Sequence, residues 1–337
     1  MSLNTVWFVL VAVLFVGYFF LEGFDYGVGM LMPLVGRTDR ERRAVIATIG
    51  PVWDANEVWL ITAGGAIFAA FPNFYATLFS GFYLALALLL TALICRGVAL
   101  EFRSKDANPR WRKLWDGLVV FGSIVPPVVW GIAMGNVLRG LAINGQMNYV
   151  GTFWGLLNPY GLVGGLAALL IFALHGALYL TLKTTDALQR RARQMAFRIG
   201  GAATGVYFLF VVLSYFYTPF PSRLGLDPGV IPILAGLTMI SVRFLLQRNL
   251  YGWAFAMNGA AIVFSVGTVF AVLYPDLIFS TLNPHWSLTV FNAASNAYSL
   301  RVMTLLAVSA LPLVLAYQAW TYWVFRQRVT LKQPFHY

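Results

Sequence analysis

Long apolar stretches without polar alternation dominate this chain. Nine stand out, at about 5–34, 45–71, 74–101, 116–139, 160–182, 199–217, 229–247, 252–273 and 299–325. A helix needs about 20 apolar residues to cross a bilayer, whereas a strand of a membrane barrel needs about 10 residues of alternating polarity. The pattern therefore predicts an all-α integral membrane protein with nine transmembrane helices.

The basic residues fall mainly on one side of these stretches. Of the 23 lysines and arginines, 19 follow or flank the ends of the odd-numbered stretches, three lie on the opposite side (Arg139, Arg223 and Arg301), and Arg96 lies inside the third stretch. Because cytoplasmic loops are enriched in Lys and Arg, this predicts an outside N-terminus and a cytoplasmic C-terminus. The C-terminal tail contributes Arg326, Arg328 and Lys332 to the cytoplasmic set.

The order of the stretches predicts one membrane domain over 1–337. We expect a first four-helix bundle in 1–140, a second in 141–298, and a peripheral ninth helix with a cytoplasmic tail in 299–337. The longest outer connections, 140–159 and 274–298, should lie in the interface as short amphipathic pieces. We expect no cleavable signal peptide, because no basic segment precedes the long first stretch.

Composition narrows the class of protein further. The chain is 60% hydrophobic and 10% charged, whereas a soluble domain has about 25% charged residues. An ordinary soluble enzyme, a disordered chain and a collagen-like fibre are therefore excluded. A single cysteine, Cys95, excludes a disulfide scaffold, a cysteine zinc site and a cysteine-ligated iron–sulfur cluster. The net charge of +11 is explained by a basic membrane face, so we expect no nucleic-acid partner.

Half of the twelve carboxylates lie in or at the ends of the first four stretches. They are Glu22, Asp25, Asp54, Glu57, Glu101 and Asp116, while Asp39, Glu41, Asp106, Asp186, Asp227 and Asp276 lie in or beside loops. An acid in hydrocarbon costs roughly 2.5–3.5 kcal/mol even on a lenient scale, so six of them in one half of the chain need a purpose or a partner.

The spacing and depth of these acids indicate a route. Glu22 and Asp25, like Asp54 and Glu57, are three residues apart and share a helix face. At 1.5 Å per residue, Asp25 and Asp54 lie roughly 12–14 Å, and Glu22 and Glu57 roughly 17–18 Å, from the cytoplasmic ends of their helices. Glu101 and Asp116 mark the cytoplasmic ends of the third and fourth stretches. Together the six acids predict a proton route from the cytoplasm to the middle of the membrane.

Structural roles compete with this interpretation. Arg96 could pair with Glu101 or Asp116, Asp116 could cap a helix N-terminus, and Glu22 and Glu57 could be protonated and hydrogen-bonded in place.

The sequence offers few other candidates for a functional site. His175 lies in the middle of the fifth stretch, but His285 and His336 lie at opposite ends, so we predict a hydrogen-bonded histidine and no haem ligand. Five glycines are expected to allow close helix packing: Gly29, Gly64, Gly65, Gly164 and Gly165. No metal cluster, nucleophile triad or phosphate loop is evident, and the aromatics that could line a quinone cleft cannot be singled out.

Three motifs resemble subunit II of cytochrome bd-type quinol oxidases. They are Gly23-Phe24-Asp25-Tyr26-Gly27-Val28-Gly29, then Gly50-Pro51-Val52-Trp53-Asp54-Ala55-Asn56-Glu57-Val58-Trp59-Leu60, and then Glu101-Phe102-Arg103 followed by Arg110-Trp111-Arg112 and Trp115-Asp116. The match is specific over 20–120 and extends over the whole chain in its pattern of stretches. Gly23, Gly27, Trp53, Asn56, Trp59 and Arg96 are interpreted as motif or structural residues.

The resemblance implies a subunit of an electrogenic quinol:dioxygen oxidoreductase in a bacterial cell membrane. Two haems b and one haem d would belong to a haem-bearing subunit I, the heterodimer partner, and this chain would bind none. It would support that subunit, contribute the acids matching Asp25 and Asp54 to a proton route, and in some members hold a quinone. Quinol and membrane lipid would be further partners, and a small single-span third subunit stays open.

A second interpretation uses the same acids differently. A proton-coupled secondary transporter could form its substrate site at a helix interrupted by Pro126-Pro127 in the fourth stretch. The haem absorbance of the complex purified through this chain separates the two functions.

Overall fold

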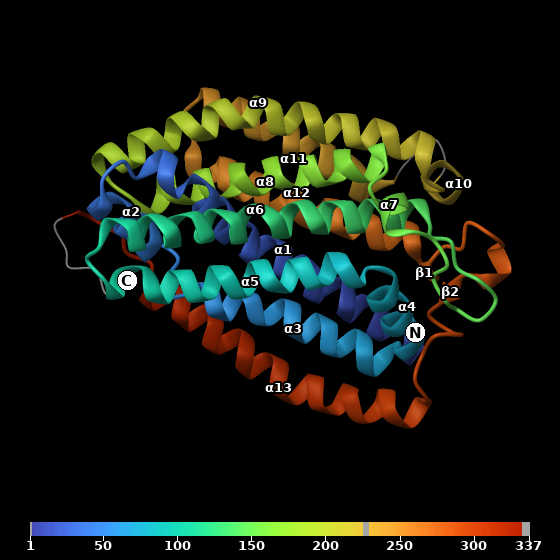
Figure 1. Ribbon diagram of the computed structural model, residues 1–337. Helices are drawn as coiled ribbons and strands as arrows, with labels where there is room; N and C mark the ends of the chain where they lie inside the picture. The colour runs from blue at the N-terminus through green and yellow to red at the C-terminus, as the bar shows by residue number, and fades with distance from the viewer. Residues whose placement is uncertain (1, 225–228, 332–337) are drawn as a thin grey trace.

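The computed structural model describes residues 2–224 and 229–331, so Asp227, Lys332 and His336 lie outside the described residues. Helices make up most of it (Figure 1). The first half contains α1 (Leu3–Val35), α2 (Asp39–Ala47), α3 (Trp53–Ala70), α4 (Pro72–Gly81), α5 (Tyr83–Phe102), the 3-10 turn η1 (Arg103–Lys105) and α6 (Pro109–Arg139). The second half contains α7 (Phe153–Leu156), α8 (Pro159–Lys183), α9 (Asp186–Tyr217), α10 (Phe220–Leu224), α11 (Val230–Gln247), α12 (Tyr251–Leu273), β1 (Asp276–Ile278), η2 (Pro284–Trp286), β2 (Leu288–Thr289) and α13 (Ala297–Val324).

The all-α membrane architecture is confirmed, but the count of nine spans is not. Among the described residues, eight helices are long and apolar enough to cross a membrane: α1, α5 with η1, α6, α8, α9, α11, α12 and α13. The missing one is the second expected span, 45–71. Its helical core, α3, has 18 residues and begins with Asp54, Asn56 and Glu57 in its first turns, so it falls below that criterion although it runs beside α5 and α13 (Figure 1).

Two expected spans are broken, one of them where the local sequence stops a helix. The stretch 45–71 divides into α2 and α3 because the chain turns over Thr48–Val52, and Pro51 has no N–H with which to continue a helix. The stretch 74–101 divides at Phe82 into α4 and α5, and Pro72 occupies the first position of α4, where its missing N–H costs nothing. The helix α6 begins at Pro109, seven residues before the expected start, with Asn108 as its N-cap.

The membrane helices pack in two groups, joined where α1 and α6 of the first contact α8 of the second. In the first group α1 packs on α3 and α6, and α5 packs on α6; in the second, α8 packs on α9 and α12, and α11 packs on α9 and α12. At the crossing of α1 and α8, a Cβ on Gly27 would lie 2.1 Å from the carbonyl oxygen of Phe172, so only glycine permits this approach. The boundaries of the proposed bundles, 1–140 and 141–298, stay predictions.

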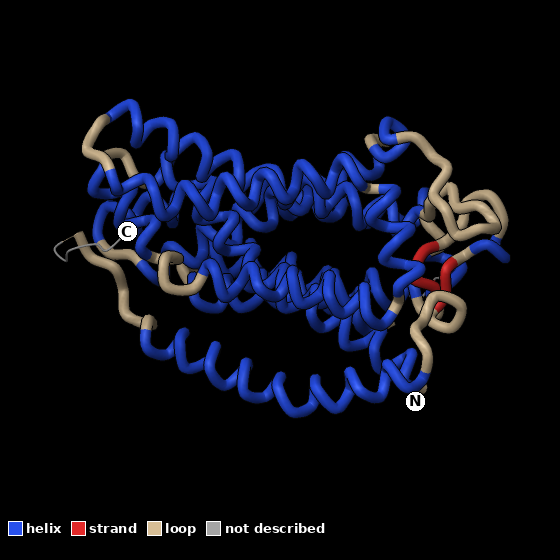
Figure 2. Tube along the Cα trace, turned by 60° about the horizontal axis from the view of Figure 1, so that its bottom comes forward, coloured by secondary structure: helices blue, strands red, loops and turns tan. Residues whose placement is uncertain are grey.

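The last helix, α13, lies along one side of the molecule, apart from the other helices over much of its length (Figure 2). Only 6% of its most apolar stretch is buried within the chain, against 61% for α8. It is peripheral, as expected. Near its start, the Trp7 indole donates to the carbonyl oxygen of Leu300 and to Thr304.

The two ends of the helices differ. At one end, which we call the basic end, lie α2, η1, the start of α9 and the end of α13; the N-terminus and the strands lie at the other end (Figures 1 and 2). There, the connections 140–159 and 274–298 pair with each other, and their position in the membrane interface stays a prediction. Leu141 exchanges backbone hydrogen bonds with Phe279 and Thr281, and β1 pairs with β2 in an antiparallel ladder.

Candidate functional site

A buried charged cluster lies where α1, α3 and α5 meet. The Nη1 of Arg96 on α5 donates to the carboxylate of Glu22 on α1 and, over 3.1 Å, to Glu57 on α3. Arg96 and Glu22 are fully buried, while the Glu57 side chain is 18% exposed. The Arg96 guanidinium also lies over the ring of Tyr26, 4.8 Å from its centroid. The expected pairing of Arg96 with Glu101 or Asp116 is therefore wrong: Glu101 is five residues, or roughly 7.5 Å, further along the helix.

Asp25 joins this cluster from the same face of α1 as Glu22. It is fully buried, and its Oδ2 accepts a hydrogen bond of 2.6 Å from the Asn56 amide on α3. Among the described residues its Oδ1 has no hydrogen-bond partner, and neither has Oε2 of Glu22. If all three carboxyls of Glu22, Asp25 and Glu57 were ionised, one guanidinium would leave two buried negative charges uncompensated, which is costly. An arrangement in which all three carboxyls are ionised is therefore disfavoured.

Two polar residues of α13 complete the site, and the sequence pattern did not identify either of them. Gln318 donates to Oδ1 of Asn56 over 3.3 Å and accepts from the Trp59 indole over 2.9 Å. The hydroxyl of Tyr322 donates to the same Asn56 oxygen over 2.7 Å. A glutamine and a tyrosine in an apolar helix are unremarkable in composition; only their burial against α3 identifies them.

The other predicted route acids are not brought into this cluster. Asp54 lies on the exposed side of α3, and Glu101 is exposed at the end of α5. Asp54 and Glu57 are three residues apart, but the edge of the buried face runs between them. Asp54 is exposed, and it is Asn56 that contacts Asp25 where the spacing suggested an acid.

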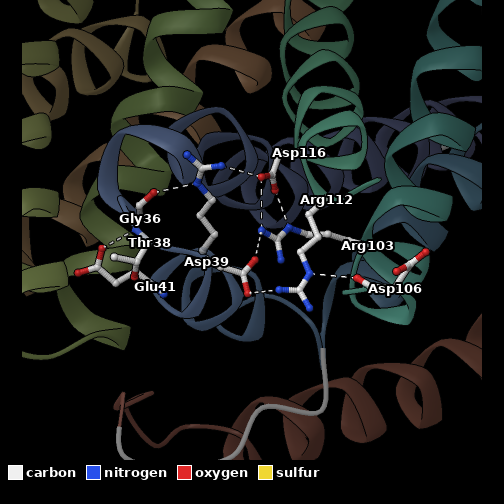
Figure 3. Close-up of polar contacts among 9 residues, drawn as sticks. Gly36, Thr38, Asp39, Glu41, Arg103, Asp106, Arg112 and Asp116 are labelled. Carbon is white, nitrogen blue, oxygen red and sulfur yellow. Dashed lines mark hydrogen bonds and ion pairs between the residues drawn. The ribbon is translucent and has the colours of Figure 1, made fainter. Parts of the chain in front are cut away.

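Asp116 belongs to a separate ion-pair network at the basic end (Figure 3). Arg103 donates through Nε to Asp116 over 2.5 Å and through Nη2 to Asp39 over 3.0 Å. Arg42 binds Asp116 over 2.7 Å, and Arg112 binds Asp39 over 2.8 Å. The capping role considered for Asp116 is wrong, because it lies two turns inside α6. Within the part of the chain that the structure describes, this network shares no hydrogen bond or ion pair with the Arg96 cluster.

The glycines and tryptophans of the motifs position these helices. A Cβ on Gly23 would meet the Phe172 ring at 3.0 Å, and one on Gly17 would lie 2.2 Å from the Trp59 ring. Trp53 packs against Gly97 of α5. The packing role expected for five glycines holds for Gly29, Gly164 and Gly165, whereas within the described chain a Cβ on Gly64 or Gly65 meets nothing within 4 Å.

His175 is buried and hydrogen-bonded through both ring nitrogens. Its Nδ1 accepts from the Asn258 amide over 3.2 Å, so its Nε2 carries the proton that it donates to the carbonyl oxygen of Phe20, also over 3.2 Å. The ring stacks on Phe255 with centroids 4.5 Å apart. His285 lies in η2, at the far end from the basic end. Over residues 2–224 and 229–331 there is no cluster of His, Cys, Asp and Glu that could hold a metal ion.

An apolar cavity of about 180 Å³ lies among α6, α8, α9, α11 and α12. Its walls include Trp130, Met134, Phe210 and Ile262. Tyr207 provides a polar group there, and its hydroxyl accepts a hydrogen bond of 3.2 Å from Ser265. The cavity is large enough for part of an apolar ligand with few polar atoms.

The chain is similar to known proteins over its whole length. The family model of cytochrome bd terminal oxidase subunit II matches residues 3–325. Cytochrome bd ubiquinol oxidase subunit 2 of Bacillus subtilis (strain 168) is 44% identical over 336 residues, covering 100% of this chain and 99% of that relative. Cytochrome bd-I ubiquinol oxidase subunit 2 of Escherichia coli (strain K12) is 36% identical over 362 residues, covering 97% and 95%.

The fold is also similar to a solved structure. A chain of the bd oxidase from Geobacillus thermodenitrificans superimposes with a TM-score of 0.78, covering 96% of this chain and 99% of that one. The identity of 17% makes this a likeness of fold alone.

Proposed function

The chain belongs to the cytochrome bd terminal oxidase subunit II family, and we propose that, as a subunit of a quinol:dioxygen oxidoreductase, it delivers protons to the complex through its own buried acids. It is a multi-pass cell-membrane protein. Reduction of dioxygen to water consumes one proton for each electron, so a membrane oxidase needs protonatable groups that lead from one surface toward its buried reaction centre. Asp25, with one carboxyl oxygen held by Asn56 and the other without a partner, is the observation that carries this proposal.

The direction of the proton route follows from the charges at the two ends. Positive residues are concentrated at the basic end, which is therefore the cytoplasmic end on the positive-inside rule. We propose that the N-terminus lies outside and that protons enter at the basic end. Glu22, Asp25 and Glu57 receive them around Arg96, whereas Asp116, held by two arginines, and the exposed Glu101 are given no step in the transfer.

The exposure of Asp54 supports a contact between this side of α3 and the partner subunit. An exposed acid facing lipid inside the membrane costs roughly 2.5–3.5 kcal/mol on a lenient scale, which favours a protein neighbour instead. On the same helix Ile61 is 73% and Phe68 60% exposed, and Gly64 and Gly65 face open space. We propose that the haem-bearing subunit I covers this side of α3 and that Asp54 passes protons across that interface.

We propose that the partner subunit, and not this chain, holds the haem groups. The described histidines do not fit a haem of this chain, because both nitrogens of His175 are occupied and His285 lies at the far end from the basic end. Two haems b and one haem d would therefore be held by subunit I. A single-span third subunit stays a prediction.

A bound quinone is supported by the apolar cavity beside Trp130. The hydroxyl of Tyr207 accepts from Ser265, so its own proton is free to donate to a quinone carbonyl. We propose that the cavity holds a quinone. Solvent extraction and mass spectrometry of the purified complex should recover quinone, and replacement of Ala261 in the cavity wall by Trp should lower the recovered amount several-fold at unchanged haem content. Equal recovery from both complexes contradicts this assignment.

The proposed proton role is tested by removing single carboxylates. In the complex purified through this chain, Asp25→Asn and Asp54→Asn should slow oxygen-dependent quinol oxidation at least tenfold. Asp186→Asn is the matched control, because Asp186 is exposed at the basic end and has a positive φ that asparagine tolerates. Normal turnover at normal haem content in both membrane variants would remove the assignment.

The transporter alternative is disfavoured by α6. The helix runs without interruption from Pro109 to Arg139 through Pro126 and Pro127, so the broken helix that such a site requires is not formed there. The absorption spectrum of the same complex decides: haem b and haem d bands are expected, and their absence would favour transport.

A further inference from the structure

The hydrogen bonds around Asn56 have only one consistent direction. The indole of Trp59 is a donor only, so the atom of Gln318 facing it must be the amide oxygen, and the Gln318 amide nitrogen then faces Asn56. With Gln318 and Tyr322 both donating to its oxygen, the Asn56 amide must present its nitrogen to Asp25. Every bond in this chain therefore points its hydrogen toward the carboxylate of Asp25.

The position of Gln318 makes this arrangement unusual for its helix. Only Leu300 and Gln318 are buried in α13, which has 28 residues. A buried amide on an otherwise exposed, apolar helix is not needed for packing in hydrocarbon. It therefore has a specific polar task, and its contacts are Trp59 and Asn56.

A cavity at the basic end leads to the same residues. It has a volume of about 180 Å³ and lies between the turn after α2, the end of α8 and the end of α13. Thr48, Tyr179, Tyr322 and Arg328 line it. The chain after α13 closes one side, where Val329 donates to the carbonyl oxygen of Lys183 over 2.7 Å. Tyr322 thus borders the cavity, and its hydroxyl contacts Asn56.

We propose that Gln318 and Tyr322 are positioning residues for Asp25: acting through Asn56, they hold its carboxylate as an acceptor near the inner end of the basic-end cavity, from which it takes up protons. This inference rests on the proposed proton role of Asp25. Loss of either donor weakens the hold on the Asn56 oxygen, and so lowers the free-energy cost of turning that oxygen toward Asp25. A carboxyl facing that oxygen must carry a proton to form a hydrogen bond, so the equilibrium moves toward the protonated acid.

Other titratable or charged groups lie around Asp25 on the neighbouring helices. They are Glu22 on α1, Glu57 on α3, Arg96 on α5, Tyr179 on α8 and Tyr322 on α13. The variants Tyr322→Phe and Gln318→Met leave the first four unchanged, so a shift in pH dependence would report the donor chain. Tyr317→Phe is the matched control, because Tyr317 lies on the same helix and is 66% exposed.

Two readouts on the intact oxidase complex test the inference. The pH midpoint of quinol oxidation should rise by roughly one pH unit in Tyr322→Phe and Gln318→Met, equivalent to a tenfold change in proton affinity, at normal haem content. In pH-difference infrared spectra, the carboxyl band that Asp25→Asn removes should titrate with the same shift. The control should match the wild type in both.

The outcomes separate this inference from the proposed function. A wild-type midpoint and a wild-type Asp25 band in both variants would overturn the positioning role while leaving the proton role intact. Unchanged turnover in Asp25→Asn would overturn the proton role, and the infrared band would still decide whether the donors hold the carboxylate. If Gln318→Met lowers haem content, Tyr322→Phe decides, since it removes one oxygen atom and keeps the ring against Phe24.

Discussion

At the scale of single residues, the buried acids behave as one group around Arg96. The sequence located them well: Glu22 and Asp25 do share a face of α1, and Glu57 meets them at the same depth. It could not place Asp54, because the rotation of α3 about its axis depends on distant contacts. Trp59 fills the space at Gly17 and binds Gln318, which is 259 residues away in sequence.

The guanidinium of Arg96 should be essential for stability. Arg96→Met leaves Glu22 and Glu57 without their cation, and breaking a buried pair by removing one partner costs about 3–5 kcal/mol. Thermal inactivation of the purified complex should therefore occur at a clearly lower temperature. Adding Glu22→Met to that variant should restore part of the loss.

Arg40→Met provides the comparison for this variant. Arg40 is exposed at the basic end, and its loss should leave the inactivation temperature unchanged. Equal stability of Arg96→Met and Arg40→Met would show that the buried pair is not needed.

At the scale of elements, the helices were predictable and their breaks were less so. Apolar length identified the membrane helices, because burial in lipid requires it of each one separately. The break at Phe82 could not be read from composition, since the residues on both sides are apolar. The break at Thr48–Val52 carried a signal in Gly50 and Pro51, which the apolar run around them concealed.

One ion pair connects the two helix groups at the basic end. Glu41 closes the capping box of α2 with Thr38, and its carboxylate accepts bonds from both terminal nitrogens of Arg191 on α9. Arg191, together with the backbone N–H groups of Thr38 and Arg37, lowers the pKa of Glu41 from 4.5 to about 2. A lowered pKa stabilises the folded state above the ordinary value of 4.5, and that contribution is lost as the pH falls through about 2.

Glu41→Gln should remove this pH-dependent contribution. Glutamine keeps the acceptor for the cap and loses the charge, so the variant should unfold more easily than the wild type at pH 6. Because protonation removes the same charge from the wild type, the difference should shrink as the pH is lowered from about 4.5 toward about 2. Melting curves of the purified complex across this range measure it, and a difference that is constant with pH would contradict the assignment.

At the scale of the whole molecule, one side of the helices needs a neighbour. Asp54, Ile61 and Phe68 on α3 are exposed, as are Leu84, Leu88 and Leu90 on α5. Exposed leucines suit lipid or protein equally, but Asp54 suits only a polar partner. The sequence indicated an acid of functional importance at this position; only the structure shows that it is exposed, on the side where we propose the partner subunit.

The most direct test of proton delivery through Asp25 is to measure proton uptake during a single reaction of the complex with oxygen. The fully reduced complex is mixed with oxygen in the presence of a pH-indicator dye, and proton uptake is followed beside the haem absorbance. The wild type should take up protons in step with oxygen reduction, and Asp25→Asn should slow the uptake at least tenfold while oxygen binding to haem stays unchanged. Wild-type uptake kinetics in Asp25→Asn, at normal haem content, would contradict the proposed proton role of Asp25.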